Sequence, residues 1–165
     1  MGQRDEEVQR KKSVGLKQMY ELRRIGLNER DIITNLFKDV FTNEPWNDDW
    51  SDEAQLDMYI SDLIGQSHSL TYGLYDGDEL IGLSMGYIKH WFRGTEYCID
   101  ELCIKTDRQG AGVGSFFIRE IEKAISGIGI KKIFLQTDTY APAYEFYKKR
   151  GFIEEKGHVS FSKEV

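Results

Sequence analysis

The stretch RQGAGVGS, residues 108–115, is the most informative part of this sequence, because glycine occupies three of its eight positions. It follows a predicted strand at 96–104 and precedes a predicted helix, on whose inner face Phe116, Phe117 and Ile121 recur at helical spacing. Glycines between a strand and a helix let backbone N–H groups approach an anion, and the helix N-terminus adds positive potential. The stretch therefore predicts a phosphate or pyrophosphate site, although a tight turn without a ligand uses the same residues.

Two familiar nucleotide-binding motifs do not fit this turn. A P-loop needs a lysine directly after its last glycine, and this turn lacks one. A dinucleotide-binding G-x-G-x-x-G motif needs a third glycine where this sequence has Ser115 or Phe117, depending on the glycine from which the motif is counted. The pattern that remains is Q-x-x-G-x-G, with Gln109, Gly112 and Gly114 at its defined positions.

This pattern resembles the pyrophosphate-binding motif (R/Q)-x-x-G-x-(G/A) of the GNAT superfamily of acetyl-CoA-dependent N-acetyltransferases. Two further segments resemble the same family. IDELCI at 99–104 is similar to its fourth strand, and AYEFYKKRGF at 143–152 is similar to its A-x-x-x-Y-x-x-x-G-F signature. All three segments stand in the family's order with the right elements between them, so the chain is identified as a member of the superfamily.

The resemblance implies which residues bind acetyl-CoA, the co-substrate of the family. A main-chain N–H near Cys103 or Ile104 would polarise the thioester carbonyl. Tyr147 would protonate the departing CoA thiolate, because a phenol keeps its proton at neutral pH. Two departures from the family pattern are Tyr140 in place of a usual asparagine and a missing proline after Ile104. The residues expected to contact acetyl-CoA are Cys103, Ile104, Gln109, Gly110, Ala111, Gly112, Val113, Gly114, Ser115, Tyr140 and Ala143.

Two adjacent carboxylates are candidates for the general base that takes a proton from the acceptor amine. Asp100 and Glu101 would point to opposite faces of a regular strand, so only one of them can easily serve the site. Members of the family commonly carry a β-bulge in this strand, which leaves the facing of the two side chains open. We favour Glu101 slightly as the base and keep Asp100 as the alternative.

In the family, the acceptor is recognised by the first two helices and by the loop before the fourth strand, here about 40–66 and 89–96. Both segments place acidic residues among aromatic ones, which suits a cationic or aromatic amine through charge and cation–π contacts. Packing of the helix pair explains the tryptophans of the first segment equally well. The residues expected to bind the acceptor are Trp46, Asp49, Trp50, Trp91 and Glu96.

The predicted function is transfer of an acetyl group from acetyl-CoA to a primary amine of a small cationic acceptor, by direct attack through a tetrahedral intermediate. A short Ile-Asp-x-Leu run at 99–102 also resembles some aminoglycoside 6′-acetyltransferases, so we expect an aminoglycoside- or polyamine-like acceptor. Two alternatives stay open: a catalytically silent CoA-binding regulatory module, and an acetyltransferase of a peptide or protein N-terminus. Dimers are common in the family, so a homodimer is a further possibility.

The pattern of apolar residues predicts an α/β (α+β) fold, in which a mixed, mostly antiparallel sheet of about six to seven strands carries helices on both faces. This is the layout of the GNAT fold. One domain is expected over 19–165, preceded by a polar and flexible extension at 1–18. The expected strands lie at 20–25, 70–75, 79–89, 96–104, 133–136, 152–154 and 158–162. The expected helices lie at 29–42, at 51–64, between the glycine turn and Gly127, and at 141–150.

Composition narrows the class of protein further. The 165 residues carry a net charge of −6, which argues against broad nucleic-acid binding, since such binding depends on neutralising phosphates. No apolar run approaches the roughly 18 residues that span a bilayer, so no membrane association is expected and the predicted location is the cytoplasm. Cys98 and Cys103 lie roughly 16 Å apart along one predicted strand and cannot form a disulfide with each other. The histidines are scattered, and no metal site is predicted.

Overall fold

The computed structural model describes residues 20–165. They form two compact units, one that ends at Leu135 and one that runs from Gln136 to Val165. The polar extension predicted at 1–18 lies outside the described residues, and the single domain over 19–165 stays a prediction. No helix among the described residues is both long enough and apolar enough to span a lipid bilayer.

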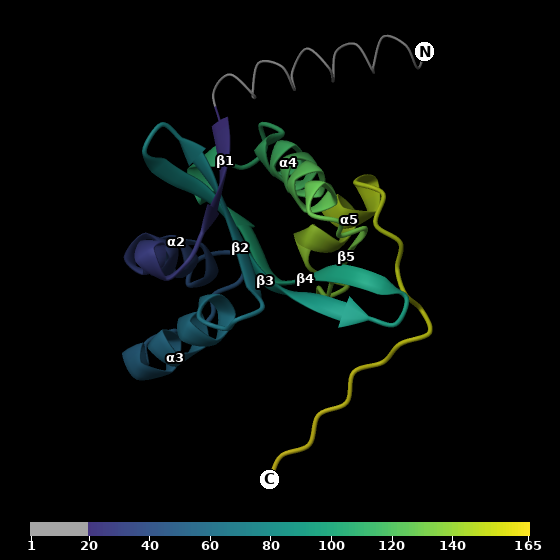
Figure 1. Ribbon diagram of the computed structural model, residues 1–165. Coiled ribbons are helices and arrows are strands. Elements are labelled where there is room, and N and C mark those ends of the chain that lie inside the picture. Colours follow the sequence, from purple (N-terminus) through teal and green to yellow (C-terminus); the bar gives the residue numbers. More distant parts are fainter. Residues whose placement is uncertain (1–19) are drawn as a thin grey trace. The chain divides into compact units, whose positions relative to one another are not determined.

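The first unit is built on a five-stranded sheet whose strands lie side by side in the order of the chain (Figure 1). Its first four strands are antiparallel, and the fifth runs parallel to the fourth. A mixed, mostly antiparallel sheet is therefore confirmed. The strands are β1 (Tyr20–Ile25), β2 (Ser69–Asp76), β3 (Glu79–Trp91), β4 (Gly94–Ile104) and β5 (Lys132–Leu135). Cys98 and Cys103 are both buried on β4 and are free thiols, as predicted.

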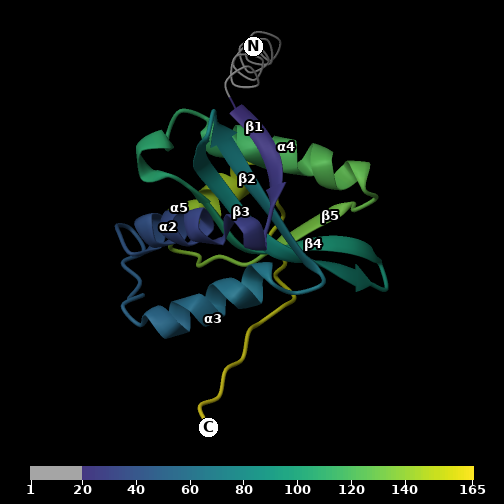
Figure 2. The same ribbon diagram turned by 60° about the vertical axis from the view of Figure 1, so that its left-hand side comes forward.

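Helices cover both faces of this sheet, as predicted (Figures 1 and 2). The helices of this unit are α2 (Arg30–Phe41), α3 (Glu53–Ile64) and α4 (Val113–Gly127). The pair α2 and α3 buries Phe37 and Leu56 in a core on one face, and α4 buries Phe116 and Phe117 in a second core on the other. Because each buried Å² of apolar surface contributes about 25 cal/mol, these two cores hold the layers together and make the sheet a rigid platform.

The connection between β3 and β4 is shorter than predicted. We expected strands at 79–89 and 96–104 with a loop between them, whereas β3 continues to Trp91 and β4 begins at Gly94, its partner in the ladder. Gly94 has a φ of 130°, which residues with a side chain rarely adopt. The glycine therefore lets the chain reverse over Phe92 and Arg93, and the hairpin is longer than the sequence pattern suggested.

The predicted count of six to seven strands was too high. The described residues contain five strands, and the segment 152–162, which we expected to form two, contains none. Its apolar residues Ile153, Val159 and Phe161 are 90%, 70% and 93% exposed. Alternation of apolar and polar residues stabilises a strand only when one face is buried, and this segment has no buried face.

Candidate active site

β4 changes its surroundings halfway along its length. Residues 96–99 pair with β3 on one side and with β5 on the other, whereas residues 101–104 pair with β3 alone. Within the described residues, no strand pairs with 100–104 on the side of β5. Apart from the Ile104 carbonyl, which accepts a hydrogen bond from Gln109, the backbone groups along that edge are not paired with another strand and are available to a bound molecule. The N–H predicted to polarise a thioester carbonyl, near Cys103 or Ile104, belongs to this part of the strand.

A β-bulge at Asp100 determines which way the two candidate bases face. Ile99 and Glu101 pair with neighbouring residues of β3, so Asp100, which lies between them, has no partner there. Ile99 and Leu102 both pack on the side of α4, although they are three positions apart and a regular strand would send them to opposite faces. The extra residue therefore turns Glu101 toward α3.

Glu101 is partly buried and accepts a hydrogen bond from an aromatic hydroxyl. The hydroxyl of Tyr59, on α3, donates to Glu101 Oε1 at 2.6 Å. Burial raises the pKa of the Glu101 carboxyl, the hydrogen bond from Tyr59 lowers it, and the negative charges of Asp100 and Asp48 raise it further. Desolvation by its neighbours also raises the pKa of Asp100, although the residue is exposed on the bulge. A carboxylate with a raised pKa accepts a proton more readily, which suits a general base.

Aromatic rings form a wall beside Tyr59. Trp50 stacks on Tyr59 with ring centroids 5.0 Å apart and planes at 17°, and Phe37 meets Trp50 edge-on at 5.4 Å. Trp46 lies against Phe41 at 5.8 Å in the same apolar cluster. Trp50 Nε1 is buried and has no hydrogen-bond partner among the described residues. Trp46 and Trp50, two of the three tryptophans predicted to bind the acceptor, thus lie in the cluster that contains Tyr59, where they also pack the helix pair.

The acidic residues before α3 differ in what they contact. Asp49, which we predicted to bind the acceptor, is exposed and accepts a hydrogen bond from the Ser51 N–H at 3.1 Å. Hydrogen bonds from Ser51 lower the pKa of the Asp49 carboxyl. The charge of its neighbour Asp48 acts on both Glu101 and Tyr59. Asp48, which was not among our predicted site residues, therefore belongs to the surroundings of the candidate base.

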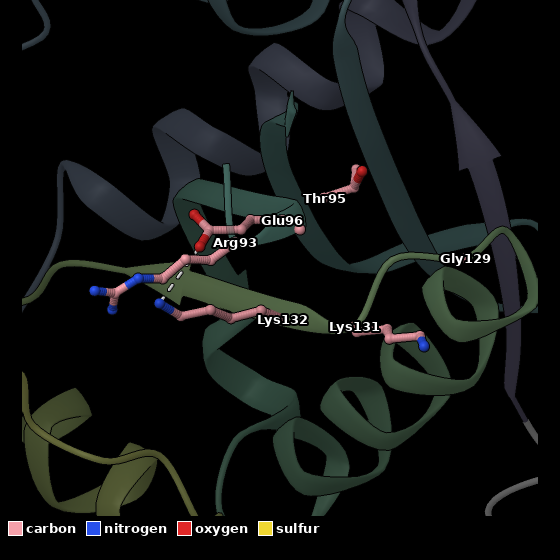
Figure 3. Close-up of a pocket in the computed structure, with 7 residues that line it drawn as sticks. Arg93, Thr95, Glu96, Gly129, Lys131 and Lys132 are labelled. Atoms are coloured by element: carbon pink, nitrogen blue, oxygen red, sulfur yellow. Dashed lines mark ion pairs between the residues drawn. The ribbon is translucent and has the colours of Figure 1, made fainter. Parts of the chain in front are cut away.

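The two other residues predicted to bind the acceptor belong to the far end of the β3–β4 hairpin. Glu96 precedes Glu101 by five positions, roughly 16 Å along a strand. It is buried, and its carboxylate forms an ion pair with Lys132 Nζ of β5 at 3.4 Å (Figure 3). Trp91 is 46% exposed, and Lys89 Nζ lies 4.2 Å from the centre of its ring. The structure does not bring these two residues together with Glu101.

A pocket of about 400 Å³ opens beside Glu96 (Figure 3). Its charged lining consists of Glu96 and three cations, Arg93, Lys131 and Lys132. Figure 3 shows Arg93 and Lys132 extending on the side of Glu96, whereas Lys131 points the other way. The lining carries a net positive charge, which disfavours a cationic amine. This pocket is therefore distinct from the site around Glu101.

The glycine turn has the geometry of an anion site. Gly110 and Gly112 have φ values of 82° and 83°, a left-handed conformation that residues with a side chain rarely adopt. Among the described residues none caps the start of α4 with a side chain, and the first turn of this helix holds no acidic residue. The first N–H groups of a helix have no partner within it. These N–H groups and the helix dipole are therefore open to the pyrophosphate that the sequence predicts here.

Side chains anchor this turn to the sheet. Gln109 Nε2 donates to the carbonyl oxygen of Ile104 at 2.9 Å, which ties the turn to the end of β4. Arg108 forms ion pairs with Asp76 at 2.9 Å and with Glu79 at 2.7 Å, next to the β2–β3 connection. The side chain of Gln109 is thus engaged with the protein, and the donors that the turn offers to a ligand are backbone N–H groups.

The second unit contains Tyr147, the residue predicted to act as the acid, on α5 (Pro142–Lys149). Its ring lies 5.2 Å from that of Phe152 and 5.4 Å from that of Phe146. The helix ends at Lys149, two residues before Gly151, whose φ is 86°, and the Phe152 N–H donates to the Tyr147 carbonyl at 3.1 Å. Gly151 therefore forms a left-handed cap just beyond the end of α5.

Two further residues predicted to contact acetyl-CoA lie in the second unit. Tyr140 is 86% exposed, and its hydroxyl donates to a carboxylate oxygen of Asp138 at 3.0 Å. Ala143 lies in the first turn of α5, one helical turn before Tyr147. Both residues thus lie at or just before the start of the helix that carries Tyr147.

Besides Asp48, Tyr59 is a residue of this site that was not among the predicted site residues. It recurs with Leu56, Ile60 and Leu63 at helical spacing, so the pattern predicted an apolar contact. Its polar partner, Glu101, lies 42 residues away in the sequence. The one available signal was the residue type, since a tyrosine on the inner face of a helix usually finds a partner for its hydroxyl.

A model of the Acetyltransferase (GNAT) family matches residues 30–152 of this chain. The matched region begins at α2, contains β2 to β5 and α5, and ends at Phe152, just beyond the left-handed cap. It therefore includes all three segments on which the resemblance rests. Among curated protein sequences, no relative matches the chain.

Solved structures share the fold at low sequence identity. The aminoglycoside acetyltransferase meta-AAC0020 from an uncultured soil metagenomic sample, in complex with sisomicin, is 18% identical with a TM-score of 0.70, covering 91% of this chain and 99% of that one. AAC(6')-Iy, in complex with the bisubstrate analog CoA-S-monomethyl-acetylneamine, is 13% identical with a TM-score of 0.68, covering 88% and 99%. A ribosomal-protein-alanine N-acetyltransferase from Brucella melitensis biovar Abortus 2308 is 13% identical with a TM-score of 0.67, covering 88% and 99%.

Proposed function

The chain belongs to the GNAT family of acetyltransferases, and on that premise we propose that it transfers an acetyl group from acetyl-CoA to a primary amine of a small cationic acceptor. The observation that carries this proposal is the hydrogen bond from Tyr59 of α3 to Glu101 in the second half of β4. A partly buried carboxylate with a raised pKa lies there beside aromatic rings and further acids. These are the groups that attract an ammonium ion and can then remove its proton.

The proposed reaction uses Glu101, backbone N–H groups of β4 and of the glycine turn, and Tyr147. Glu101 accepts a proton from the acceptor ammonium, directly or through water, so that the amine becomes a nucleophile. Acetyl-CoA supplies the activated thioester, and a main-chain N–H near Cys103 or Ile104 would bind its carbonyl oxygen. The backbone of the turn at 109–115 would hold the pyrophosphate. As the C–N bond forms and the C–S bond breaks, Tyr147 gives its proton to the sulfur.

The acceptor class is proposed from charge. Asp48 and Asp100 add negative charge around Glu101, and the neighbouring Trp46 and Trp50 offer ring faces to a cation. Two proteins of the same fold support an aminoglycoside-like acceptor, since one was solved with sisomicin and the other with an acetylneamine analog. Both are below 20% identical to this chain, so they support only the expectation that the fold accommodates such amines.

The first test is the release of free thiol from acetyl-CoA over a panel of aminoglycosides, polyamines, amino acids and short peptides. Turnover with an aminoglycoside or polyamine, and little with peptides, would support the proposal. Turnover with peptides alone would instead indicate an enzyme of peptide or protein N-termini. Tight binding of acetyl-CoA without any turnover would favour the silent regulatory module.

Tyr147→Phe tests the proposed acid in the same assay. We expect kcat to fall roughly a hundredfold, because the thiolate must then leave without a positioned proton donor. Acetyl-CoA affinity should be retained, since the phenyl ring keeps its contacts with Phe146 and Phe152.

Tyr144→Phe is the matched control for this experiment. Tyr144 lies on the same helix, and its hydroxyl donates to Glu154 at 3.2 Å. Removing this exposed contact should leave kcat unchanged, because hydrogen bonds between exposed groups contribute little to the fold. An equal loss in both variants would show that Tyr147→Phe acts by disturbing α5 and would contradict the proposed proton transfer.

A further inference from the structure

One hydrogen bond connects the proposed base to the helix that covers it. The Tyr59 hydroxyl donates to Glu101 Oε1 at 2.6 Å, a length typical of a hydroxyl that donates to an ionised carboxylate. Resting on the proposed role of Glu101 as the proton acceptor, we propose that Tyr59 is the residue that positions the Glu101 carboxylate for acyl transfer. Tyr59 acts through Glu101 and has no contact of its own with the reacting atoms in this proposal.

The ring of Tyr59 is held in place from two sides. Trp50 stacks on one face of it at 5.0 Å, and Phe37 contacts it at 5.9 Å with planes inclined by 59°. The next residue of α3, Ile60, is fully buried in the same core. A side chain locked by packing delivers its hydroxyl to a fixed point, which is what orientation of a base within a fraction of an ångström requires.

The hydrogen bond leaves one oxygen of the base free for chemistry. Glu101 Oε1 is occupied by the phenol, and within the described residues Oε2 accepts no hydrogen bond. The bond therefore sets the rotation of the carboxylate and directs Oε2 to the acceptor amine or to a bridging water. Without it, the carboxylate could rotate and share its lone pairs among several directions.

Tyr59 also acts on the charge state of Glu101. The titratable groups around this carboxylate are Tyr59 from α3, Asp48 from the α2–α3 connection, and Asp100 and Cys103 from β4. Burial and the two aspartates raise the pKa of Glu101, and the phenol is the group that opposes them. Burial and the charge of Glu101 raise the pKa of Tyr59 itself, so the phenol keeps its proton and stays a donor.

Tyr59→Phe gives a direct test through the pH dependence of kcat/KM. Loss of the hydrogen bond raises the pKa of Glu101, so the acidic limb of the profile should move to higher pH. At pH values below the acidic limb we expect kcat/KM to fall roughly ten- to a hundredfold, which corresponds to the free energy of a hydrogen bond to a charged group. The loss should shrink as the pH rises, down to the constant factor that the misoriented carboxylate leaves. A side chain that only supports the fold would lower the rate by one factor at every pH and would leave the acidic limb in place.

Tyr97→Phe is the matched control, because it removes a tyrosine hydroxyl from the opposite face of the sheet. Tyr97 is fully buried on the α4 side, and its hydroxyl donates to the Leu70 carbonyl at 3.0 Å. This variant should be less stable than the wild type and should keep the acidic limb in place. A limb that moves in both variants would mean that lost stability shifts the profile, and it would overturn the proposal.

A readout that does not depend on activity separates this inference from the proposed function. The Glu101 carboxyl can be titrated by ¹³C NMR in the free protein and assigned with Glu101→Gln. We expect its midpoint to rise in Tyr59→Phe together with the acidic limb. If Tyr59→Phe leaves the Glu101 titration midpoint and the acidic limb unchanged while Glu101→Gln is inactive, only the positioning role of Tyr59 is overturned. A fully active Glu101→Gln would overturn the proposed base and, with it, this inference.

Discussion

The two halves of β4 contain two glutamates that face the same side of the sheet but have different surroundings. In the first half, with neighbours on both edges, Glu96 is buried and pairs with Lys132 of β5. In the second half, with one neighbour and a bulge, Glu101 pairs with the neutral phenol of Tyr59. Where the sheet is complete, the acid is neutralised by a cation. Where pairing stops, an acid with a raised pKa lies beside open backbone groups, and this half is the one that can do chemistry.

Glu101→Gln is expected to have the largest effect, because it removes the proposed base and leaves the rest of the site intact. We expect kcat/KM to fall about 10²- to 10⁴-fold at neutral pH, the usual contribution of a general base. Asp100→Asn, one position away on the bulge, should cost less than about tenfold, since Asp100 only adds charge near the site. The reverse ranking of the two variants in a thiol-release assay would show that the bulge presents Asp100 as the base.

Gly112→Ala should have the next largest effect, and Gly129→Ala is its matched control. Both glycines have nearly the same backbone angle, with φ of 83° and 84°, and a methyl group at either position meets no atom within 4 Å. Each variant should therefore lose about 1–2 kcal/mol of stability from the left-handed conformation alone.

The two glycine variants should differ in their use of acetyl-CoA. A methyl group at Gly112 stands at the proposed approach of the pyrophosphate, so we expect the KM for acetyl-CoA to rise at least about tenfold. Gly129, at the other end of α4, should leave this KM unchanged. Steady-state kinetics over acetyl-CoA concentration, with thermal melts of both variants, makes the comparison. Equal KM values would place the pyrophosphate elsewhere.

The smallest expected effects concern stability, and they have opposite signs in the two halves of β4. The folded-state pKa of Glu101 is raised above its ordinary value of 4.5, so the ionised group destabilises the fold as the pH rises through that raised pKa. Glu101→Gln should then raise Tm at pH 7 by roughly 2–4 °C, or about 1 kcal/mol. This gain should vanish below pH 4.5, where the carboxyl is protonated in both states.

Glu96→Gln should instead lower Tm slightly at pH 7. It removes the ion pair with Lys132, whose side chain is half exposed, so the loss should be no more than about 1 kcal/mol. Differential scanning calorimetry of both variants at pH 4 and pH 7 measures whether each substitution raises or lowers Tm. A Tm that falls in both variants at neutral pH would mean that Glu101 is neutralised by a charge contact, as Glu96 is, and would remove the contrast between the two halves.

The glycine turn and the main helices could be predicted from the sequence because their causes are local. Gly110 and Gly112 adopt backbone angles that other residues avoid, so the residue type itself marks the turn. The helices are visible because their apolar residues recur at the helical period and face a core. The same reasoning failed at 152–162, where alternating residues look like strands but have no face to bury.

The facing of Glu101 and its contact with Tyr59 could not be predicted in this way. The alignment of β3 and β4 decides which residue of β4 is left without a partner, and here that residue is Asp100. A different alignment would turn every side chain beyond the bulge to the other face of the sheet. Tyr59 reaches Glu101 because α3 packs on the sheet, although 42 residues separate the two in the chain. Both outcomes depend on the free energy of contacts between distant segments, which no local pattern records. The anion-binding turn is thus encoded by neighbouring residues, whereas the surroundings of the acid arise from packing.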